Sequence, residues 1–363
     1  MLLRNERVLA LLLIFLFLFT TVGAQNSSPQ TPTAPASPAP NPVGPAAAGP
    51  QPASPSGNSP AGGQGTAPLS QPRQDQNRPS TNDDTTFVFK AEVQNVVLHA
   101  TVVDDKNHLV MNLEKGAFAV FENNQPQTII SFAREDVPVA MGIVIDNSGS
   151  MREKRDKVNK AALNLVRSSN PQDQVFVVNF NDEYYLDQPF TSNINLLKEA
   201  LEKVEARGGT ALYDAIVASA DYMKRNARLQ KKVIFVVTDG EDNASRETLE
   251  ETVRRLQEEN GPAVYAIGLL GEERARRARR ALETIAQKTG GIAFLPRTTD
   301  EVDEISRNIA HDIRSQFAIG YKPTTPKDAG GYRVVRVEAR AKGYSKLTVR
   351  TRTGYYPGQE VEQ

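Results

Sequence analysis

Between residues 139 and 316, short runs of apolar residues alternate with amphipathic segments of helical length. The apolar runs have the length of buried strands, and they are Ala140–Ile145, Val175–Phe180, Val233–Thr238, Ala263–Leu269 and Gly291–Leu295. The helical segments are Arg152–Ser168, Ile194–Ala206, Ala211–Arg228, Ser245–Glu259, Glu272–Thr289 and Thr299–Gln316, and Tyr184–Phe190 adds an edge strand. Because apolar strands joined by helices need cover on both faces, we predict a doubly wound, mostly parallel, Rossmann-like α/β sheet with helices on both sides.

Strand patterns flank this α/β block on both sides. They are Phe87–Val93, Val96–Val103, Ala117–Glu122 and Thr128–Phe132 before it, and Phe317–Tyr321, Tyr332–Ala339 and Leu347–Thr353 after it. Each group is too small to close a core of its own. We therefore expect residues 85–137 and 317–357 to pair as two halves of one small antiparallel β domain, with the α/β domain 138–316 inserted between them.

Residues 1–24 have the features of a secretory signal. Arg4 and Arg7 precede the apolar run Val8–Phe19, and Val-Gly-Ala at 22–24 fits a cleavage site. The run is shorter than the ~20 residues that a membrane-spanning helix needs. We expect an exported protein that is periplasmic, on the cell surface or secreted. An uncleaved N-terminal membrane segment is the alternative.

The next segment, residues 25–84, holds most of the 23 prolines of the chain, interleaved with Ser, Ala, Gly, Gln and Asn. With so few large apolar residues it cannot bury enough surface to offset its chain entropy. We interpret it as a disordered spacer, and residues 358–363 as a disordered tail.

Charge and cysteine content exclude several classes of protein. The 43 Lys and Arg residues equal the 43 Asp and Glu residues, so no net field favours nucleic acid or an anionic membrane. An arginine-rich stretch at 274–280 has helical spacing that places its arginines on solvated faces. The chain has no cysteine, which excludes disulfides, thiolate metal sites and a thiol nucleophile.

Three loops carry side-chain oxygens to one predicted edge of the sheet. Asp146, Ser148 and Ser150 alternate along the loop after the first central strand, and Gly149 allows a tight bend. Thr210 follows two glycines, and Asp239 ends another apolar strand. Ligands collect at the carboxyl ends of strands in such sheets, and five side-chain oxygens suit a hard cation such as Mg²⁺. Zinc is disfavoured, since the three histidines are scattered.

This pattern, Asp-x-Ser-x-Ser with a later Thr and an Asp in Thr-Asp-Gly, resembles the metal-ion-dependent adhesion site of von Willebrand factor type A domains. The resemblance covers 139–316 and implies one Mg²⁺, or Mn²⁺ or Ca²⁺. It also implies that Ser148, Ser150 and Thr210 contact the ion directly, while Asp146 and Asp239 act through water and hydrogen bonds. In such domains the last helix, here 299–316, shifts when the ion gains a carboxylate, and that shift would reach the following strand.

A narrower resemblance is to the related domain family expanded in acidobacteria. It rests on Phe-Ala-Arg-Glu-Asp-Val-Pro at 132–138, Thr-Asp-Gly-Glu-Asp-Asn at 238–243 and Phe-Ala-Ile-Gly-Tyr at 317–321. The acids at 182, 183, 241 and 242 are further residues that we place near the metal rim, or in loops where they serve solubility.

Several functions remain open at this point. The first is a non-enzymatic module that binds the Asp or Glu carboxylate of a protein partner through the ion, for adhesion or assembly. The second is an envelope scaffold in which the metal only stabilises the fold. A metal-dependent hydrolase is disfavoured, because no residue offers a general base. The three loops could also be polar helix caps, although capping does not explain why three match together.

Overall fold

The computed structural model describes residues 95–134, 136–168, 170–270 and 275–358. The predicted signal segment, the spacer, the strand Phe87–Val93 and the tail beyond residue 358 lie outside these ranges. Among the described residues, no helix has the length and apolar character needed to cross a membrane.

A six-stranded sheet forms the centre of the α/β part, in the order β10-β9-β8-β5-β6-β7. Its strands are β5 Val139–Asp146, β6 Gln174–Phe180, β7 Tyr184–Thr191, β8 Lys231–Thr238, β9 Ala263–Gly268 and β10 Ala293–Phe294. All neighbours are parallel except β7, which runs antiparallel to β6 at one edge. β5 is buried along its whole length between β6 and β8. The predicted doubly wound, mostly parallel α/β fold is confirmed.

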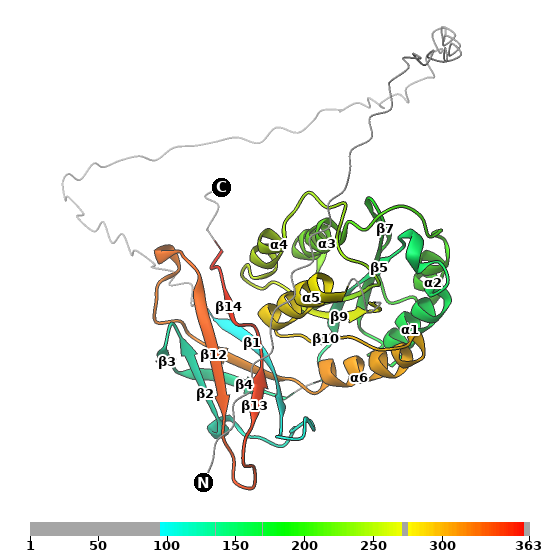
Figure 1. The fold of residues 1–363 in the computed structure, drawn as a ribbon. Helices are drawn as coiled ribbons and strands as arrows, with labels where there is room; N and C mark the ends of the chain where they lie inside the picture. Colours follow the sequence, from blue (N-terminus) through cyan, green and yellow to red (C-terminus); the bar gives the residue numbers. More distant parts are fainter. Residues whose placement is uncertain (1–94, 135, 169, 271–274, 359–363) are drawn as a thin grey trace, which may run out of the picture. The chain divides into compact units, whose positions relative to one another are not determined.

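Six α-helices among the described residues cover the two faces of this sheet (Figure 1). They are α1 Arg155–Arg167, α2 Ile194–Glu202, α3 Leu212–Asn226, α4 Leu249–Leu256, α5 Ala275–Thr289 and α6 Val302–Arg314. One apolar layer joins α1, α2 and α6 to the sheet, and the other joins α3, α4 and α5 to its opposite face.

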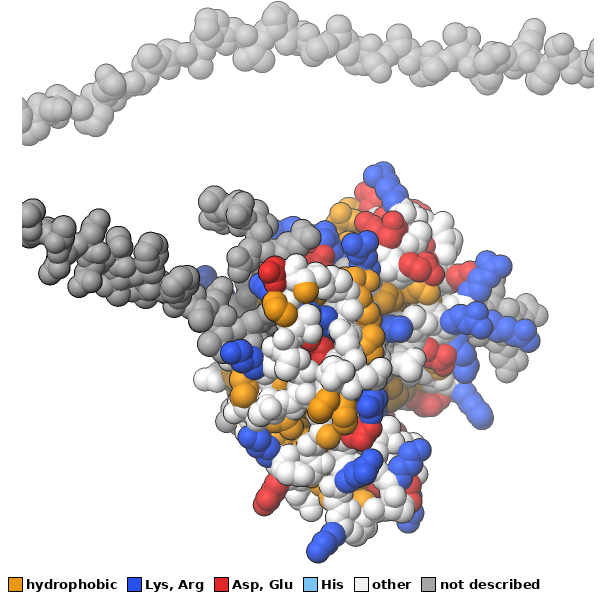
Figure 2. Space-filling view, turned by 90° about the vertical axis from the view of Figure 1, so that its left-hand side faces the viewer, with side chains coloured by type: hydrophobic (Ala, Val, Ile, Leu, Met, Phe, Trp, Pro, Cys, Tyr) orange, Lys and Arg blue, Asp and Glu red, His pale blue; other side chains and the backbone are white. Residues whose placement is uncertain are grey.

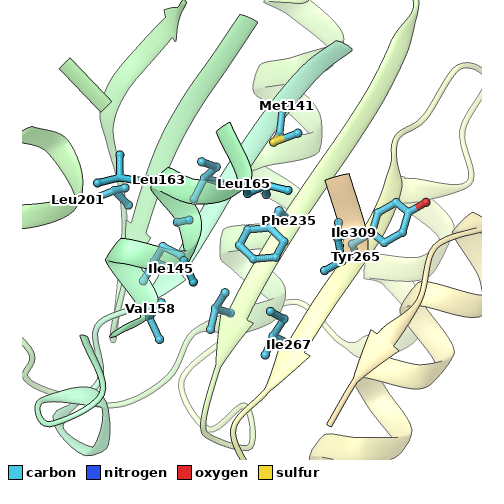
Figure 3. Packing of buried hydrophobic residues seen from close by; sticks show 14 of the residues in the cluster. Met141, Ile145, Val158, Leu163, Leu165, Leu201, Phe235, Tyr265, Ile267 and Ile309 are labelled. Carbon is cyan, nitrogen blue, oxygen red and sulfur yellow. The ribbon is translucent and has the colours of Figure 1, made fainter. Parts of the chain in front are cut away.

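Figure 3 shows the first of these layers. Ile145 of β5 and Phe235 of β8 point toward α1, and Ile309 of α6 lies beside Tyr265 of β9. All four side chains are fully buried, and burying a side chain of this size stabilises a fold by roughly 1.5–3 kcal/mol. This layer fixes the position of β5, which ends in the candidate site.

Three helices, α1, α4 and α6, begin three or more residues later than the sequence pattern predicts. A short 3₁₀ turn, Gly149–Met151, precedes α1, so the loop after β5 is longer than expected. α4 begins after Thr248, whose hydroxyl accepts a hydrogen bond from the backbone of Glu251 while the Glu251 carboxylate accepts one from Thr248. This capping box fixes the start of the helix, and the preceding residues stay free to support the site.

Two four-stranded sheets form the β part, in the orders β13-β1-β11-β4 and β14-β12-β2-β3. The strands are β1 Val96–Val103, β2 Phe118–Glu122, β3 Gln125–Gln127, β4 Ile129–Ala133, β11 Phe317–Tyr321, β12 Arg333–Ala339, β13 Thr348–Arg350 and β14 Gly354–Tyr355. Strands from before the α/β part pair antiparallel with strands from after it, as in β1 with β11 and β2 with β12. The predicted insertion between two β halves is therefore present, while the short strands β3 and β14 were not predicted.

The two parts meet around a buried carboxylate near the end of α6. Asp312 accepts hydrogen bonds from the hydroxyl of Tyr265 and the guanidinium of Arg350, each at 2.6 Å. Gln316, just before β11, donates to Thr101 of β1. Polar contacts thus connect the last helix directly to the β part.

Candidate metal centre

β5 ends in Asp146, whose side chain is fully buried. One carboxylate oxygen accepts a hydrogen bond from the backbone amide of Ser148 at 2.7 Å, and the other accepts one from the hydroxyl of Thr238 at 2.6 Å. Burial raises the pKa of Asp146 to about 6, although both hydrogen bonds act in the opposite direction. A cation nearby would favour the charged form of this carboxylate.

Three side-chain oxygens lie in a row next to Asp146. The hydroxyls of Ser148 and Ser150 are 3.2 Å apart, and Ser150 donates to Asp239 at 2.7 Å. Oxygen ligands at right angles around Mg²⁺, each ~2.1 Å from the ion, are ~3.0 Å apart. The observed spacings match that arrangement, and they join the loop after β5 to the loop after β8.

The third loop, 207–210, is held against the first by backbone hydrogen bonds. The amide of Gly149 donates to the carbonyl of Gly208 at 3.2 Å, and Arg207 donates to Asn147 at 2.8 Å. Thr210 is buried, and a Cβ on Gly240 would lie only 3.1 Å from its hydroxyl oxygen. The Thr210 hydroxyl therefore lies against the residue that follows Asp239, and all five predicted site residues come together.

Side chains that the motif does not include hold the third loop in place. Asn243 accepts a hydrogen bond from the amide of Thr210 at 2.9 Å, and Asp182 accepts one from the amide of Gly209 at 2.6 Å. Asp182 and Asp242, which we placed at the rim, thus serve the loops, since Asp242 accepts from the amide of Tyr213. The sequence indicated their proximity to the site but not these partners.

A cation of the chain itself also lies at this site. The ammonium of Lys154 forms an ion pair with the second carboxylate oxygen of Asp239, whose side chain has no exposed surface. Lys154 was not among the predicted site residues. Its spacing could have indicated a place near the site, because it comes four residues after Ser150, about one helical turn further along.

The donor set fits a hard cation. It has three hydroxyls and two carboxylates, and a positive group already lies against one of the carboxylates. Within the described ranges no group of three or more His, Cys, Asp or Glu side chains is placed to hold a metal. A site here would therefore depend on hydroxyl oxygens and bound water, which suits Mg²⁺ better than softer metals.

Comparison with known proteins identifies one family for the segment that contains this site. Residues 141–241 match the family model of the von Willebrand factor type A domain. An uncharacterized protein of Synechocystis sp. is 27% identical over 109 residues, which make up 29% of this chain. The chain spans 26% of the length of that relative.

Solved structures with similar folds come from several bacteria. A von Willebrand factor type A protein of Catenulispora acidiphila is 17% identical, with a TM-score of 0.43 over 72% of this chain and 73% of that one. The vWF domain of the type V pili tip protein Mfa5 of Porphyromonas gingivalis is 14% identical, with a TM-score of 0.43 over 49% of this chain and 95% of that one. The PilB minor pilin of Streptococcus sanguinis is 15% identical, with a TM-score of 0.41 over 50% of this chain and 62% of that one. Identities this low leave the function of the chain to its own residues.

Proposed function

This chain contains a von Willebrand factor type A domain, and from that premise we propose that it is an exported, non-enzymatic module that binds a protein partner through one divalent cation. The observation that carries the proposal is the hydrogen bond from Ser150 to Asp239, which brings the loops after β5 and β8 within ligand distance of each other.

In this proposal Ser148, Ser150 and Thr210 contact the ion, and Asp146 and Asp239 act through water and hydrogen bonds. Because hydroxyl ligands are neutral, the ion keeps most of its positive charge and attracts an anionic ligand. An Asp or Glu carboxylate of a partner completes its coordination. Mg²⁺ is the ion that the donor set favours, with Mn²⁺ or Ca²⁺ as alternatives.

A binding role suits the site better than hydrolysis. Ser150 donates to one oxygen of Asp239, while Lys154 holds the other oxygen. Asp146 is buried and accepts two hydrogen bonds of its own. Neither carboxylate is thus free to act as the general base that activates water or a serine.

Export is part of the same proposal. The basic and apolar segment at residues 1–24 would direct the chain out of the cytoplasm. The proline-rich segment 25–84 would give the folded part reach from a membrane or wall.

The first experiment measures the ion alone. Calorimetry of the full chain with Mg²⁺ and with Mn²⁺ is expected to give one site. Ser150→Ala is expected to weaken it by about 10- to 100-fold, as is usual when a metal-binding residue or its hydrogen-bonding support is removed. Ser219→Ala is the matched control, because Ser219 is a buried serine of α3 whose hydroxyl donates to Ala215 in its own helix.

The second experiment tests the partner. Capture from envelope extract with the wild-type chain is expected to retain a protein that a chelator releases and Mg²⁺ restores, and Ser150→Ala is expected to lose it. A partner that stays bound with chelator present would favour a scaffold with a purely structural ion. Absence of Mg²⁺ and Mn²⁺ binding would overturn the proposal itself.

A further inference from the structure

A cavity lies at the end of the six-stranded sheet opposite to the candidate metal centre. This cavity of about 500 Å³ is lined by the first residues of β8 and β9, by the loop before β8, and by β1 and Arg352 from the β part. Pockets of roughly 300–1,000 Å³ hold small organic ligands. The cavity is therefore large enough to hold a small ligand. The charge of the residues that line it indicates which kind of ligand would bind.

The walls carry charge of one sign. Among the described residues that line the cavity, four are always or usually cationic and none is acidic. They are Arg228, Lys231, Lys232 and Arg352. The chain as a whole has equal numbers of basic and acidic residues, and Figure 2 shows charges of both signs interspersed on the outer face of the β part. The concentration of cations in the cavity is thus local.

These cations are poorly neutralised. Neither Arg228 nor Lys232 has an ion pair or side-chain hydrogen bond among the described residues. Lys231 is 3% exposed and donates to the backbone carbonyl of Ile313, and Arg352 donates to the carbonyl of Glu258 at 2.9 Å. A carbonyl offers a partial charge only. Carboxylates also attract Lys231 and Arg352, but none of them lines the cavity.

The pKa values of these cations and of His99 also reflect an excess of positive charge in the cavity. Burial lowers the pKa of Lys231 to about 8 and that of Arg352 to about 10. Burial also lowers the pKa of His99, to about 3, with Lys231 and Arg352 contributing to the shift. Each shift means that the protonated form is unfavourable where it lies. An anion in the cavity would reverse that effect on every one of these groups.

The remaining wall is apolar and amide-bearing. Val97, Leu229 and Ala263 supply apolar surface, while Asn260 and Gln316 add amide groups. Inorganic ions alone would leave this apolar wall without contacts. An organic molecule with an acidic group satisfies both walls.

We propose that this cavity binds a small organic anion, whose carboxylate or phosphate group lies among Arg228, Lys232 and Arg352 and whose carbon skeleton lies against Val97 and Leu229. The site is separate from the candidate metal centre. β8 begins at the cavity with Lys231 and ends at Thr238, next to Asp239, and eight residues of strand span about 25 Å.

The test uses citrate, glycerol 3-phosphate and inorganic phosphate as probes, with calorimetry on the full chain at low ionic strength. Binding of citrate but not glycerol 3-phosphate assigns the site to carboxylates, and the reverse assigns it to phosphate esters. Lys232→Met is expected to weaken the organic probe by about 5- to 20-fold, as for the loss of one charge-assisted contact. Lys342→Met, an exposed lysine of the β part outside the cavity, is expected to change nothing.

A spectroscopic measurement guards against binding elsewhere on the surface. The ring signals of His99 are expected to move on titration with the probe and its pKa to rise, while those of His108, which is exposed and pairs with Asp104, stay fixed. Equal affinity in Lys232→Met and the wild type, an unchanged His99, or binding of inorganic phosphate alone would each overturn the proposal. So would binding of a glutamate-rich peptide with no response to any small anion.

Discussion

The two ends of the six-stranded sheet differ in how they hold charge. At the carboxyl end, Asp146 and Asp239 are buried but accept hydrogen bonds from hydroxyls and amides or pair with Lys154. At the amino end, Lys231 and Lys232 open the same strand that leads to Asp239, and the described residues that line the cavity beside them include no acidic side chain. One strand therefore begins at cations that line a cavity without acids and ends beside a buried carboxylate that accepts hydrogen bonds.

The difference follows from topology. The loops after β5 and β8 at the carboxyl end each connect a strand to a helix within the α/β part, and their amides and hydroxyls donate to the acids. The amino end faces the β part, whose contribution near Lys231 is β1 and Arg352 and includes no acidic side chain in the cavity lining. The largest effect of a substitution is expected at Lys231.

Lys231→Met is expected to flatten the dependence of stability on pH. Burial lowers the Lys231 pKa from its usual 10.5 to about 8. Between these values the unfolded chain binds more protons than the folded one, so the free energy of unfolding rises with pH across that window. The rise is on the order of 3 kcal/mol, and it disappears once the amine is removed. Urea unfolding at pH 7.5, 9 and 10.5 measures the difference.

Lys342→Met is the control for this series, because Lys342 is exposed and should leave the pH profile unchanged. Parallel profiles for the wild type and Lys231→Met would show that Lys231 is solvated, and the contrast between the two ends would then be lost.

The second prediction separates the two ends by function. Asp239→Asn removes a charge that supports the proposed ion and is expected to weaken Mg²⁺ binding by about 100-fold. The affinity for the organic anion at the other end should not change. Glu241→Gln serves as the control, because Glu241 lies two residues further along the same loop and pairs with the exposed Arg277. Calorimetry of both ligands with all three proteins tests the separation. Loss of both affinities in Asp239→Asn would mean that the two ends are coupled.

Much of the fold was predictable because its signals are local. The buried runs that became β5, β6, β8 and β9 are short and continuous, and the motif from Asp146 to Ser150 is a pattern within five residues. The meeting of Thr210 and Asp239 with that motif could also be predicted, because parallel strands end at the same edge of a sheet. These features need only periodicity and topology.

The features that were missed depend on contacts between distant residues. The sequence shows Lys231 and Lys232 as two ordinary lysines before a predicted strand. Only the fold places Arg352 with them in a cavity whose described lining has no acidic side chain. β14 escaped prediction because it has two residues, and β12 provides its pairing. Lys154 was visible as a spacing, but its partner Asp239 is 85 positions away. Electrostatic partners of this kind require coordinates.

The smallest effect is expected at Lys154. This residue places a positive charge at the carboxyl end of the sheet, as the lysines do at the amino end. Its ammonium pairs with the carboxylate that the proposed ion also needs. Because two positive charges at Asp239 repel each other, Lys154 must move away when the ion binds. Lys154→Met is therefore expected to raise Mg²⁺ affinity by about tenfold, which corresponds to ~1.4 kcal/mol.

With chelator present the same variant should unfold more easily, because Asp239 loses its partner while it stays buried. Lys157→Met is the matched control, since Lys157 lies three residues further along, in the first turn of α1, and pairs with the exposed Asp300. Calorimetry and thermal unfolding, each with and without Mg²⁺, measure both effects. If Lys154→Met bound Mg²⁺ no more tightly than Lys157→Met, the lysine would be a neighbour of the ion and not its competitor.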